Sequence, residues 1–390
     1  QRLMKMREIL LDGESLSIKK AENIPIQFNY GNYYITAENV WKAINEPVTQ
    51  KQLFEKEEIV IEGDVYYQKT GKREQSATFR MQEFHNKYVK KSLIWAAVKE
   101  VEDVTKNIKL LDLCCGKGGD LFKWQSANIK KVLGIDFSKD NIYNRNDGAC
   151  IRYINMHKKS RGGELMDVDF LVGDCGESIK KLEAFTDSRS RDYYSENYLN
   201  SKGEPMKFNI VSCQFAIHYF LNSFVRIHQF IDNVDDHLEK GGVFVGTCLD
   251  GNIVYDKLCQ KYRETGELRL ESKDEFNNTI WSIEGKFDCD DRDISREKHP
   301  VNFNIGIQLA SITGDHFEYD ESLVNFGYLT HLFEKRGFKL IANTKNMFPG
   351  DSGFEFLYKR WIKKPDVEDN LSESEKELSF MYRCFAFKKL

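Results

Sequence analysis

The spacing of apolar residues changes near residue 108, and the change separates two kinds of predicted structure. Up to about residue 80, short apolar runs alternate with charge, which favours an accessory α+β segment. Residues 86–100 then predict an amphipathic helix, whose expected buried face carries Tyr88, Ile94, Trp95 and Val98. Short apolar runs separated by helical stretches follow and predict buried strands. These runs are 108–113, 131–135, 169–172, 208–213 and 242–247. We therefore expect an accessory extension over 1–80 and a main domain over 81–390.

Strands that alternate with helices predict the class of the main domain. Parallel strands need crossover connections, so this pattern predicts an α/β fold with a mostly parallel sheet and helices on both faces. Residues 187–207 and 363–376 are polar and charged, and we expect them to be an inserted loop and a solvated loop. Residues 268–299 predict a hairpin or lid around one apolar stretch, 280–287. Alternation over 378–387 predicts a final strand that returns to the sheet.

Composition narrows the possible functions. The 390 residues carry a formal net charge of −4, so any site for a polyanion has to be a local basic patch. No apolar run approaches the roughly 18 residues that span a membrane, and no signal peptide begins the chain. We therefore expect an intracellular protein with no membrane partner. The nine cysteines show no C-x-x-C spacing, which favours buried, reduced thiols over a zinc site or a disulfide framework. Because the first residue is Gln1, we interpret the chain as a piece of a longer polypeptide.

The most informative motif is the segment 111–120, LDLCCGKGGD. It predicts a buried strand, a glycine turn and the beginning of a helix. Glycine at position 116 allows a tight turn and a close approach of the backbone to a ligand. Asp136 follows Gly116 by 20 residues and ends the next predicted strand. A carboxylate at that strand end is well placed to accept hydrogen bonds from the hydroxyls of a ribose.

Acidic residues around this turn distinguish between two kinds of cofactor. The pyrophosphate of a dinucleotide binds bare amides at a helix N-terminus, and Asp112 and Asp120 would repel it. S-adenosylmethionine has no phosphate and carries a sulfonium and an ammonium, so it suits these acids. Asp174, after the third strand, is placed to accept from the adenine amino group. Asp112 and Asp120 alone are also compatible with simple turn capping, but acids at three successive strand ends favour S-adenosylmethionine.

The segment after the fourth strand, 214–219 (QFAIHY), bears on the methyl acceptor. It lacks the Asp/Asn-Pro-Pro-aromatic element of enzymes that methylate exocyclic amines. No lysine-centred group for deprotonating a ribose hydroxyl is evident at this strand end. Phe215, His218 and Tyr219 instead suit a planar base held by stacking and by hydrogen bonds to its edge.

Five segments resemble, in order, motifs of the mRNA cap guanine-N7 methyltransferase family. Residues 111–121 resemble its cofactor loop, and 214–219 resemble its glutamine-phenylalanine…histidine-tyrosine element. Residues 86–94 resemble its asparagine…lysine helix, 321–326 its glutamate-bearing strand and 381–390 its terminal tyrosine strand. The resemblance implies a Rossmann-like class I methyltransferase with a seven-stranded, mostly parallel sheet. It is similar to the C-terminal methyltransferase domain of multifunctional capping enzymes of large cytoplasmic DNA viruses.

The resemblance also implies roles for single residues. The cofactor would be bound by Lys90, Asp112, Gly116, Asp120, Asp136, Asp174 and Gln214. The cap guanine would be bound by Asn86, Phe215, His218, Tyr219, Glu321 and Tyr382. Glu318 is a rival to Glu321, and His218 and Tyr382 also fit simpler roles as a strand-end and a core residue. Two positions depart from the family. His85 replaces an aromatic residue, and Cys114 replaces a glycine, which would be strained at a positive φ.

The implied reaction is methyl transfer from S-adenosylmethionine to N7 of the guanine in a GpppN cap. N7 carries a lone pair and no proton, so Glu321, His218 and Tyr219 would act by positioning, without a general base or a metal. The triphosphate would need a basic patch, with candidates Lys87, Lys91, Lys117, Lys123, Arg145, Arg152 and 157–161. The implied partners are the capped 5′ end of mRNA and upstream triphosphatase and guanylyltransferase domains of the same polypeptide. The domain is expected to be monomeric, in the host cytoplasm if viral and in the nucleus if cellular.

Two alternatives stay open at the level of the sequence. One is a methyltransferase of the same fold that acts on another RNA base or on a small amine. The other is a non-catalytic subunit that binds a cap or RNA. Such a subunit would be expected to have lost Asp112, Gly116 or Asp136, and all three are present.

Overall fold

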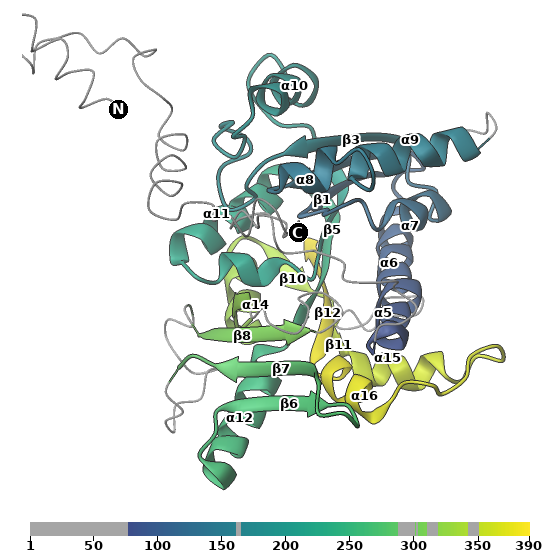
Figure 1. Cartoon of the computed structure of the whole chain (residues 1–390). Coiled ribbons are helices and arrows are strands. Elements are labelled where there is room, and N and C mark those ends of the chain that lie inside the picture. Colours follow the sequence, from purple (N-terminus) through teal and green to yellow (C-terminus); the bar gives the residue numbers. More distant parts are fainter. Residues whose placement is uncertain (1–76, 161–164, 288–300, 302, 310–318, 342–350) are drawn as a thin grey trace, which may run out of the picture. The chain divides into compact units, whose positions relative to one another are not determined.

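The structure is a computed structural model that describes residues 77–160, 165–287, 301, 303–309, 319–341 and 351–390 (Figure 1). All of these lie within one unit of the chain, Gly63–Leu390. The predicted accessory segment falls almost entirely outside the described residues, so its fold and the boundary at residue 80 stay predictions.

The central sheet has the strand order β10-β12-β5-β4-β1-β2-β3, and a short β11 pairs with β12. The strands are β1 (Lys109–Leu113), β2 (Lys131–Asp136), β3 (Asp167–Val172), β4 (Phe208–Gln214), β5 (Leu238–Leu249), β10 (Phe338–Leu340), β11 (Asp351–Gly353) and β12 (Tyr382–Lys389). Strands β1 to β5 are parallel neighbours, and β12 is antiparallel to both β5 and β10. The five strands predicted from apolar runs and the mostly parallel sheet are confirmed. Because β4 lies on the other side of β1 from β2, the strand order reverses at β1, and ligands of such sheets bind at that point.

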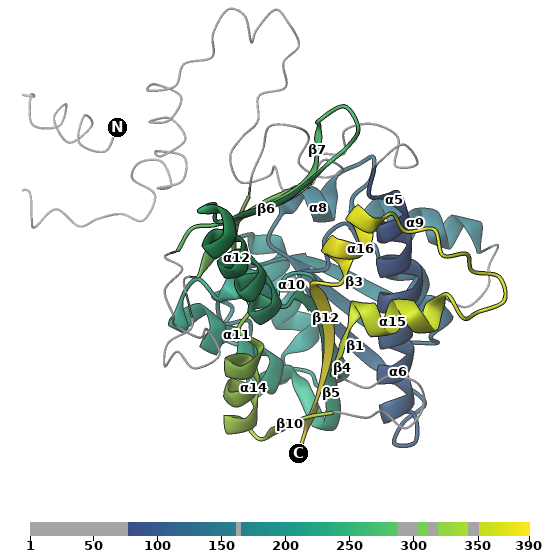
Figure 2. The same cartoon turned by 90° about the horizontal axis from the view of Figure 1, so that it is seen from below.

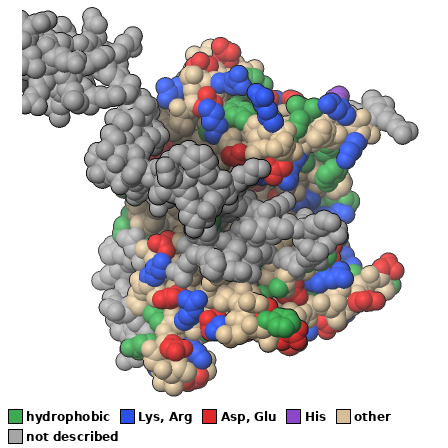
Figure 3. All heavy atoms as spheres, viewed as in Figure 1, with side chains coloured by type: hydrophobic (Ala, Val, Ile, Leu, Met, Phe, Trp, Pro, Cys, Tyr) green, Lys and Arg blue, Asp and Glu red, His purple; other side chains and the backbone are tan. Residues whose placement is uncertain are grey.

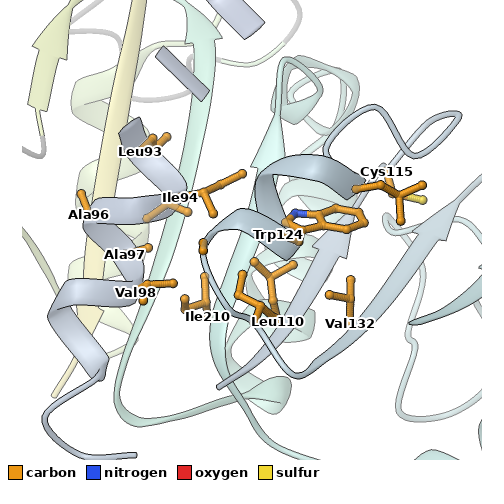
Figure 4. Packing of buried hydrophobic residues seen from close by; sticks show 14 of the residues in the cluster. Leu93, Ile94, Ala96, Ala97, Val98, Leu110, Cys115, Trp124, Val132 and Ile210 are labelled. Carbon is orange, nitrogen blue, oxygen red and sulfur yellow. The ribbon is translucent and has the colours of Figure 1, made fainter. Parts of the chain in front are cut away.

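Each face of the sheet is covered by its own helices, because neighbouring residues of a strand point to opposite faces. Leu110 packs with one cluster and Leu111 with another. The Leu110 face is covered by α6 (Lys91–Val101), α7 (Leu121–Ser126), α9 (Ala149–Lys159) and α15 (Phe354–Trp361). Figure 4 shows Ile94 and Val98 of α6 and Trp124 of α7 packed toward Leu110 and Ile210. The Leu111 face is covered by α10 (Ser188–Tyr198), α11 (Phe224–His237) and α14 (Phe326–Lys335). The prediction of helices on both faces is confirmed.

A second, antiparallel sheet lies beyond the end of β5. It has the order β6-β7-β8-β9, with β6 (Arg269–Lys273), β7 (Thr279–Gly285), β8 (Asn304–Leu309) and β9 (Tyr319–Ser322). Strands β6 and β7 form the hairpin predicted within 268–299. Helix α12 (Gly251–Thr265) lies beside β6 in both Figure 1 and Figure 2. Buried Trp281 and Ile283 pack with Val254 and Leu258 of that helix, so the face of the sheet that they share is covered by α12.

Two segments predicted to be loops contain helices, and these predictions were wrong. Helix α10 lies in 187–207, where the Asp187 side chain accepts from the amides of Arg189 and Ser190 and caps the helix. Helix α16 (Glu373–Ser379) begins inside 363–376 with a capping box formed by Ser372 and Glu375. Both helices are short and mostly polar, so capping and a few buried side chains stabilise them rather than an apolar stripe.

The helix predicted over 86–100 consists of two segments. A π-helix, η3 (Phe84–Lys90), continues directly into α6, and a short α5 (Phe79–Glu83) precedes it. Tyr88, Ile94 and Val98 are buried as predicted, but Trp95 is 42% exposed, so its assignment to the buried face was wrong. The final strand begins at Tyr382 rather than at residue 378, because Leu378 belongs to α16.

The cysteines agree only in part with the prediction of reduced thiols. Free cysteines are found at positions 114, 115, 150, 175, 213, 248 and 384. Cys259 is disulfide-bonded, so the prediction was wrong there. Within the described ranges, no three His, Cys, Asp or Glu side chains are arranged to hold a metal ion. Among the same residues, none of the helices has the length and apolar character needed to cross a bilayer.

Candidate functional site at the carboxyl ends of the strands

The carboxyl ends of four parallel strands bring the predicted cofactor residues to one edge of the sheet. Asp112 lies at the end of β1, and its register partners are Gly134 in β2 and Ser212 in β4. Asp136 ends β2, and Gln214 ends β4. The segment 114–120 leaves β1 at this edge, and Asp174 follows β3 there. The parallel strands therefore assemble residues that are more than 100 positions apart in the chain.

The loop after β1 has the backbone of a tight turn. Cys114, Gly116 and Gly118 have φ values of 64°, 54° and 66°. The amides of Cys114 and Cys115 donate to the Ile135 carbonyl at 2.8 and 3.1 Å, which ties the loop to β2. The predicted strain at Cys114 is confirmed, since a left-handed conformation costs a non-glycine residue about 1–2 kcal/mol. The loop is thus held in a strained shape next to the end of β2.

The thiol of Cys114 in this loop lies next to two other thiols. Cys114 hydrogen-bonds to both Cys175 and Cys213. The bond from Cys175 lowers the pKa of Cys114, but the bond to Cys213 and burial outweigh it and raise that pKa well above its ordinary value. Since the thiolate is the reactive form, a raised pKa keeps Cys114 protonated and inert at neutral pH.

Asp136 connects the end of β2 to the glycine turn. Its Oδ2 accepts from the Gly116 amide at 2.7 Å, and its Oδ1 accepts from the Ser138 amide at 3.0 Å and from Asn141 Nδ2 at 2.9 Å. Ser138 caps the following helix, α8 (Lys139–Tyr143). Burial raises the pKa of Asp136, and these three bonds oppose the shift. A carboxylate has about four acceptor positions, so one remains for a ligand hydroxyl.

Two acids and two lysines form the charged centre of the site. Asp120 is paired through its two oxygens with Lys90 Nζ at 2.7 Å and Lys123 Nζ at 2.6 Å. Burial opposes ionisation of Asp120, but the two lysines outweigh it and hold its pKa below its ordinary value. Asp112 is only 3% exposed, and its Oδ1 has no hydrogen-bond partner. Burial and the neighbouring Asp120 charge raise the pKa of Asp112 to about 8. An orphaned, buried carboxylate oxygen beside a glycine turn fits a cationic ligand group such as the ammonium of S-adenosylmethionine.

Asp174 is held by a residue that the sequence did not single out. Arg226 of α11 donates from Nη2 to Oδ1 at 2.8 Å and from Nη1 to Oδ2 at 3.0 Å, and the Gly176 amide donates to Oδ1 at 2.8 Å. Burial works against the charge of Arg226, but Asp174 outweighs it and raises the pKa of Arg226. No motif or spacing in the sequence pointed to Arg226, because it lies 52 positions from Asp174 and only the packing of α11 brings the two together.

On the other side of the edge, Glu321 meets the turn after β4. That turn is the 3₁₀-helix η4 (Ile217–Phe220), and His218 Nε2 lies 3.5 Å from Glu321 Oε1 of β9. The rings of His218 and Tyr219 are in edge contact at 4.1 Å. Burial lowers the pKa of His218, which Glu321 opposes only in part, so the imidazole is neutral at pH 7. The rival Glu318 lies outside the described residues.

An aromatic cluster joins the two sides of the site. Phe215 stacks on His85 at 5.6 Å and contacts Tyr382 edge-on at 5.5 Å, and Tyr382 stacks on Phe354 at 5.7 Å. His85 Nε2 lies 2.8 Å from Ser379 Oγ, and burial together with Lys90 lowers the pKa of His85 to about 3. A neutral His85 therefore packs as the aromatic residue it replaces would. Lys90 Nζ lies 5.9 Å from the centre of the Phe215 ring, which links this cluster to the charged centre.

Two predicted ligands bond mainly to their own surroundings. Asn86 Nδ2 donates to the Gln82 carbonyl one turn earlier at 3.0 Å. Gln214 Nε2 donates to Ser212 Oγ, and its Oε1 accepts from Thr247 Oγ1, both at 3.2 Å. These bonds orient Gln214 along the sheet edge, while Asn86 stays within its helix.

Several candidates for the basic patch are paired with acidic side chains. Lys117 is paired with Asp140 and Asp147, Lys87 with Glu83 and Lys123 with Asp120. His157, Lys158 and Lys159 end α9 just before β3 begins, which places them at the opposite edge of the sheet. Arg161 lies outside the described residues. Figure 3 shows Lys and Arg interspersed with acidic and apolar side chains on the visible described face.

A family model and solved structures are similar to this chain. The family model described as the mRNA (guanine-N(7))-methyltransferase domain matches residues 51–390, so the match begins before the boundary predicted at residue 81. Among solved structures, the chain is similar to an S-adenosylmethionine-dependent methyltransferase from Clostridium acetobutylicum, with a TM-score of 0.37 and 13% identity over 92% of this chain and 99% of that one.

Relatives of known name point the same way. The chain is 27% identical to mRNA cap guanine-N(7) methyltransferase 1 of Oryza sativa over 72% of its length and 68% of the relative's. It is 28% identical to the mRNA cap guanine-N(7) methyltransferase of Debaryomyces hansenii over 82% of its length and 60% of the relative's. It is also 27% identical to the protein named "Probable mRNA-capping enzyme" of Acanthamoeba polyphaga mimivirus, over 60% of this chain and 20% of that protein. Because the family model matches most of its length, this chain belongs to the mRNA (guanine-N(7))-methyltransferase domain family and is a methyltransferase that depends on S-adenosylmethionine.

Proposed function

We propose that the chain transfers the methyl group of S-adenosylmethionine to N7 of the guanine in a GpppN mRNA cap. The observation that carries the proposal is the meeting of two unlike clusters at one sheet edge. The acidic cluster around Asp112 suits a cationic cofactor, and the group formed by Glu321, His218 and Tyr219 suits the edge and face of a base. Lys90 contacts both sides, since it pairs with Asp120 and lies over Phe215.

The residues of the acidic cluster fit the separate parts of the cofactor. Asp112, with its orphaned oxygen, binds the ammonium, and Lys90 binds the carboxylate with Asp120 as its partner. Asp136 uses its remaining acceptor position for a ribose hydroxyl, next to the Gly116 amide. Asp174 accepts from the adenine amino group, and Gln214 lines the edge between cofactor and base. When bound, S-adenosylmethionine supplies an electrophilic methyl group on its sulfonium.

The protein's contribution to the transfer is to orient and to stabilise charge. Guanine N7 has a lone pair and no proton, so no general base is needed. Alignment of two reactants recovers about 7–11 kcal/mol of a barrier. Glu321 accepts from the guanine N–H groups and stabilises the positive charge that grows on the base. Tyr219, Phe215 and Tyr382 add cation–π attraction, worth about 0.5–2 kcal/mol per ring.

The direct test is methyl transfer from radiolabelled S-adenosylmethionine to GpppG-capped RNA, followed by nuclease digestion. Label recovered as 7-methylguanosine supports the proposal. Label in another nucleotide, or transfer only to a small amine, would favour the alternative of a same-fold enzyme with another acceptor. Cap binding without transfer, even with the longer polypeptide present, would favour a non-catalytic subunit.

Replacing Lys90 with methionine is expected to weaken S-adenosylmethionine binding about 10- to 100-fold. The change removes a hydrogen bond to a charged group, worth about 1.5–3 kcal/mol, and leaves Asp120 with one cation instead of two. Isothermal titration calorimetry measures the effect. Lys91→Met, at the next position on an exposed side chain, is the matched control and should keep the parental affinity. Equal affinity of both variants would remove Lys90 from the cofactor site.

The setting of this activity is part of the same proposal. Residues 81–390 hold the catalytic domain, residues 1–80 are an accessory extension, and the domain works as a monomer on the capped 5′ end of mRNA. One relative bears the name of a capping enzyme and is about five times as long as the region it shares with this chain. That relative supports upstream triphosphatase and guanylyltransferase domains in the same polypeptide and a viral origin, with activity in the host cytoplasm. A cellular origin would place it in the nucleus.

A further inference from the structure

Arg226 forms a built clamp on Asp174. It donates two hydrogen bonds to the carboxylate, and the Gly176 amide donates a third. The guanidinium packs directly against the backbone at Gly176. A Cβ at that position would lie 2.6 Å from Arg226 Cζ and Nη2, so a larger residue would collide with the guanidinium. Phe220 lies 5.8 Å beneath the guanidinium, and Glu177 lies 3.8 Å to its side. The guanidinium is therefore fixed by contacts on several sides.

The clamp restricts what Asp174 can bind. An ionised carboxylate offers about four acceptor positions. Oδ1 receives two hydrogen bonds, and Oδ2 receives one from Arg226 Nη1. A bidentate arginine fixes the orientation of the carboxylate plane. The remaining acceptor position on Oδ2 therefore points in one direction, where it can accept from one donor and repels another acceptor.

We propose that Arg226 is a positioning residue that orients Asp174 so that the cofactor site selects a purine with an amino group at C6. The inference rests on the adenine role of Asp174 in the proposed function. The adenine amino group donates to the open position on Oδ2. A purine with a carbonyl at C6 places an acceptor at this position instead. The carbonyl oxygen and Oδ2 then repel each other, and the partly buried carboxylate lacks a hydrogen bond. Without Arg226, the Gly176 amide is the remaining donor named above, so the carboxylate can rotate about that one bond and loses most of this discrimination.

The test compares the affinities of two cofactor products, S-adenosyl-L-homocysteine and S-inosyl-L-homocysteine, by calorimetry. The parent is expected to favour the adenosyl form, and Arg226→Gln is expected to lower that preference about tenfold, since such a bond is worth about one order of magnitude. Arg226→Lys keeps the positive charge but cannot bind both oxygens, so it should also lose most of the preference. A ratio unchanged in both variants overturns the inference.

Controls separate this inference from a purely structural role and from failure of the proposed function. Arg336→Gln removes another arginine that is paired with α11, through Asp232, and should keep the parental ratio. If an Arg226 variant unfolds at a lower temperature but keeps the parental ratio of the two affinities, Arg226 only tethers α11. That result overturns the inference. Asp174→Ala, which leaves no side-chain acceptor, tests the premise. If Asp174→Ala retains the preference, the adenine role of Asp174 is wrong. If the preference is lost in Asp174→Ala alone, that role stands and the role of Arg226 is rejected.

Discussion

Replacing Glu321 with glutamine is expected to reduce kcat for cap methylation by about two to three orders of magnitude. The substitution keeps the size of the side chain but removes the negative charge beside His218. A group aimed at charge that develops in the transition state contributes on that scale. Because Glu321 lies on β9, away from the acidic cluster, binding of S-adenosylmethionine should stay at the parental level. Single-turnover transfer to capped RNA measures the chemical step.

The neighbouring Asp320 is the matched control for Glu321. It lies on the same strand with a side chain that is 71% exposed and is paired with Lys286. Asp320→Asn should therefore change kcat by less than about twofold, as expected for an exposed ion pair. A Glu321→Gln variant with kcat near the parental value would contradict the role of Glu321 and direct attention to Glu318.

Replacing Asp112 with asparagine is expected to abolish measurable binding of S-adenosylmethionine, and binding to the parent should depend on pH. In the free protein the pKa of Asp112 is about 8. The cationic ligand needs the ionised carboxylate, so binding below pH 8 must release a proton. Affinity should then rise by up to about tenfold per pH unit toward pH 8. It should fall again as the ligand's own amino group, with a pKa of about 7.7–8.0, loses its proton.

Calorimetry in buffers of different ionisation enthalpy detects the released proton directly. The product S-adenosyl-L-homocysteine carries the same ammonium and no sulfonium, so it should show the same rising limb. If affinity is flat between pH 6 and pH 8, or if Asp112→Asn binds like the parent, the orphaned oxygen does not serve the ammonium.

The same substitution should stabilise the protein without its ligand. The folded-state pKa of Asp112 is raised above its unfolded value near 4, so folding favours the protonated form. Stability is therefore lost as pH rises from about 4, and the loss is complete above the folded pKa of about 8. Asp112→Asn removes this penalty and should raise the free energy of unfolding by about 1–3 kcal/mol at pH 8.5. Asp167→Asn, at a side chain that is 65% exposed, should change it by less than about 1 kcal/mol.

Local rules in the sequence were enough to find the acidic half of the site. The strand β1, the glycine turn and Asp136 lie within 30 residues of one another, and each follows from strand burial, glycine backbone freedom or a strand end. Even the strain at Cys114 was foreseen, because its φ depends on the shape of the turn alone. Strand ends in a parallel sheet share an edge, so Asp174 and Gln214 were also expected there. In the guanine half, Phe215, His218 and Tyr219 were found from their place after the fourth strand, whereas Glu321 carries no local signal and needed the ordered resemblance to a family.

Only the tertiary structure decided which side chains meet. Glu321 reaches His218 across 103 positions because the antiparallel second sheet returns β9 to the turn after β4. Arg226 reaches Asp174 because α11 packs on the Leu111 face of the sheet and brings the arginine to the segment that follows β3. The polar helices α10 and α16 were missed since their stability comes from caps and a few buried contacts. The periodicity of apolar residues shows which side chains of one segment face the core and which face solvent. Contacts between distant segments depend on strand order and helix packing, which no local pattern contains.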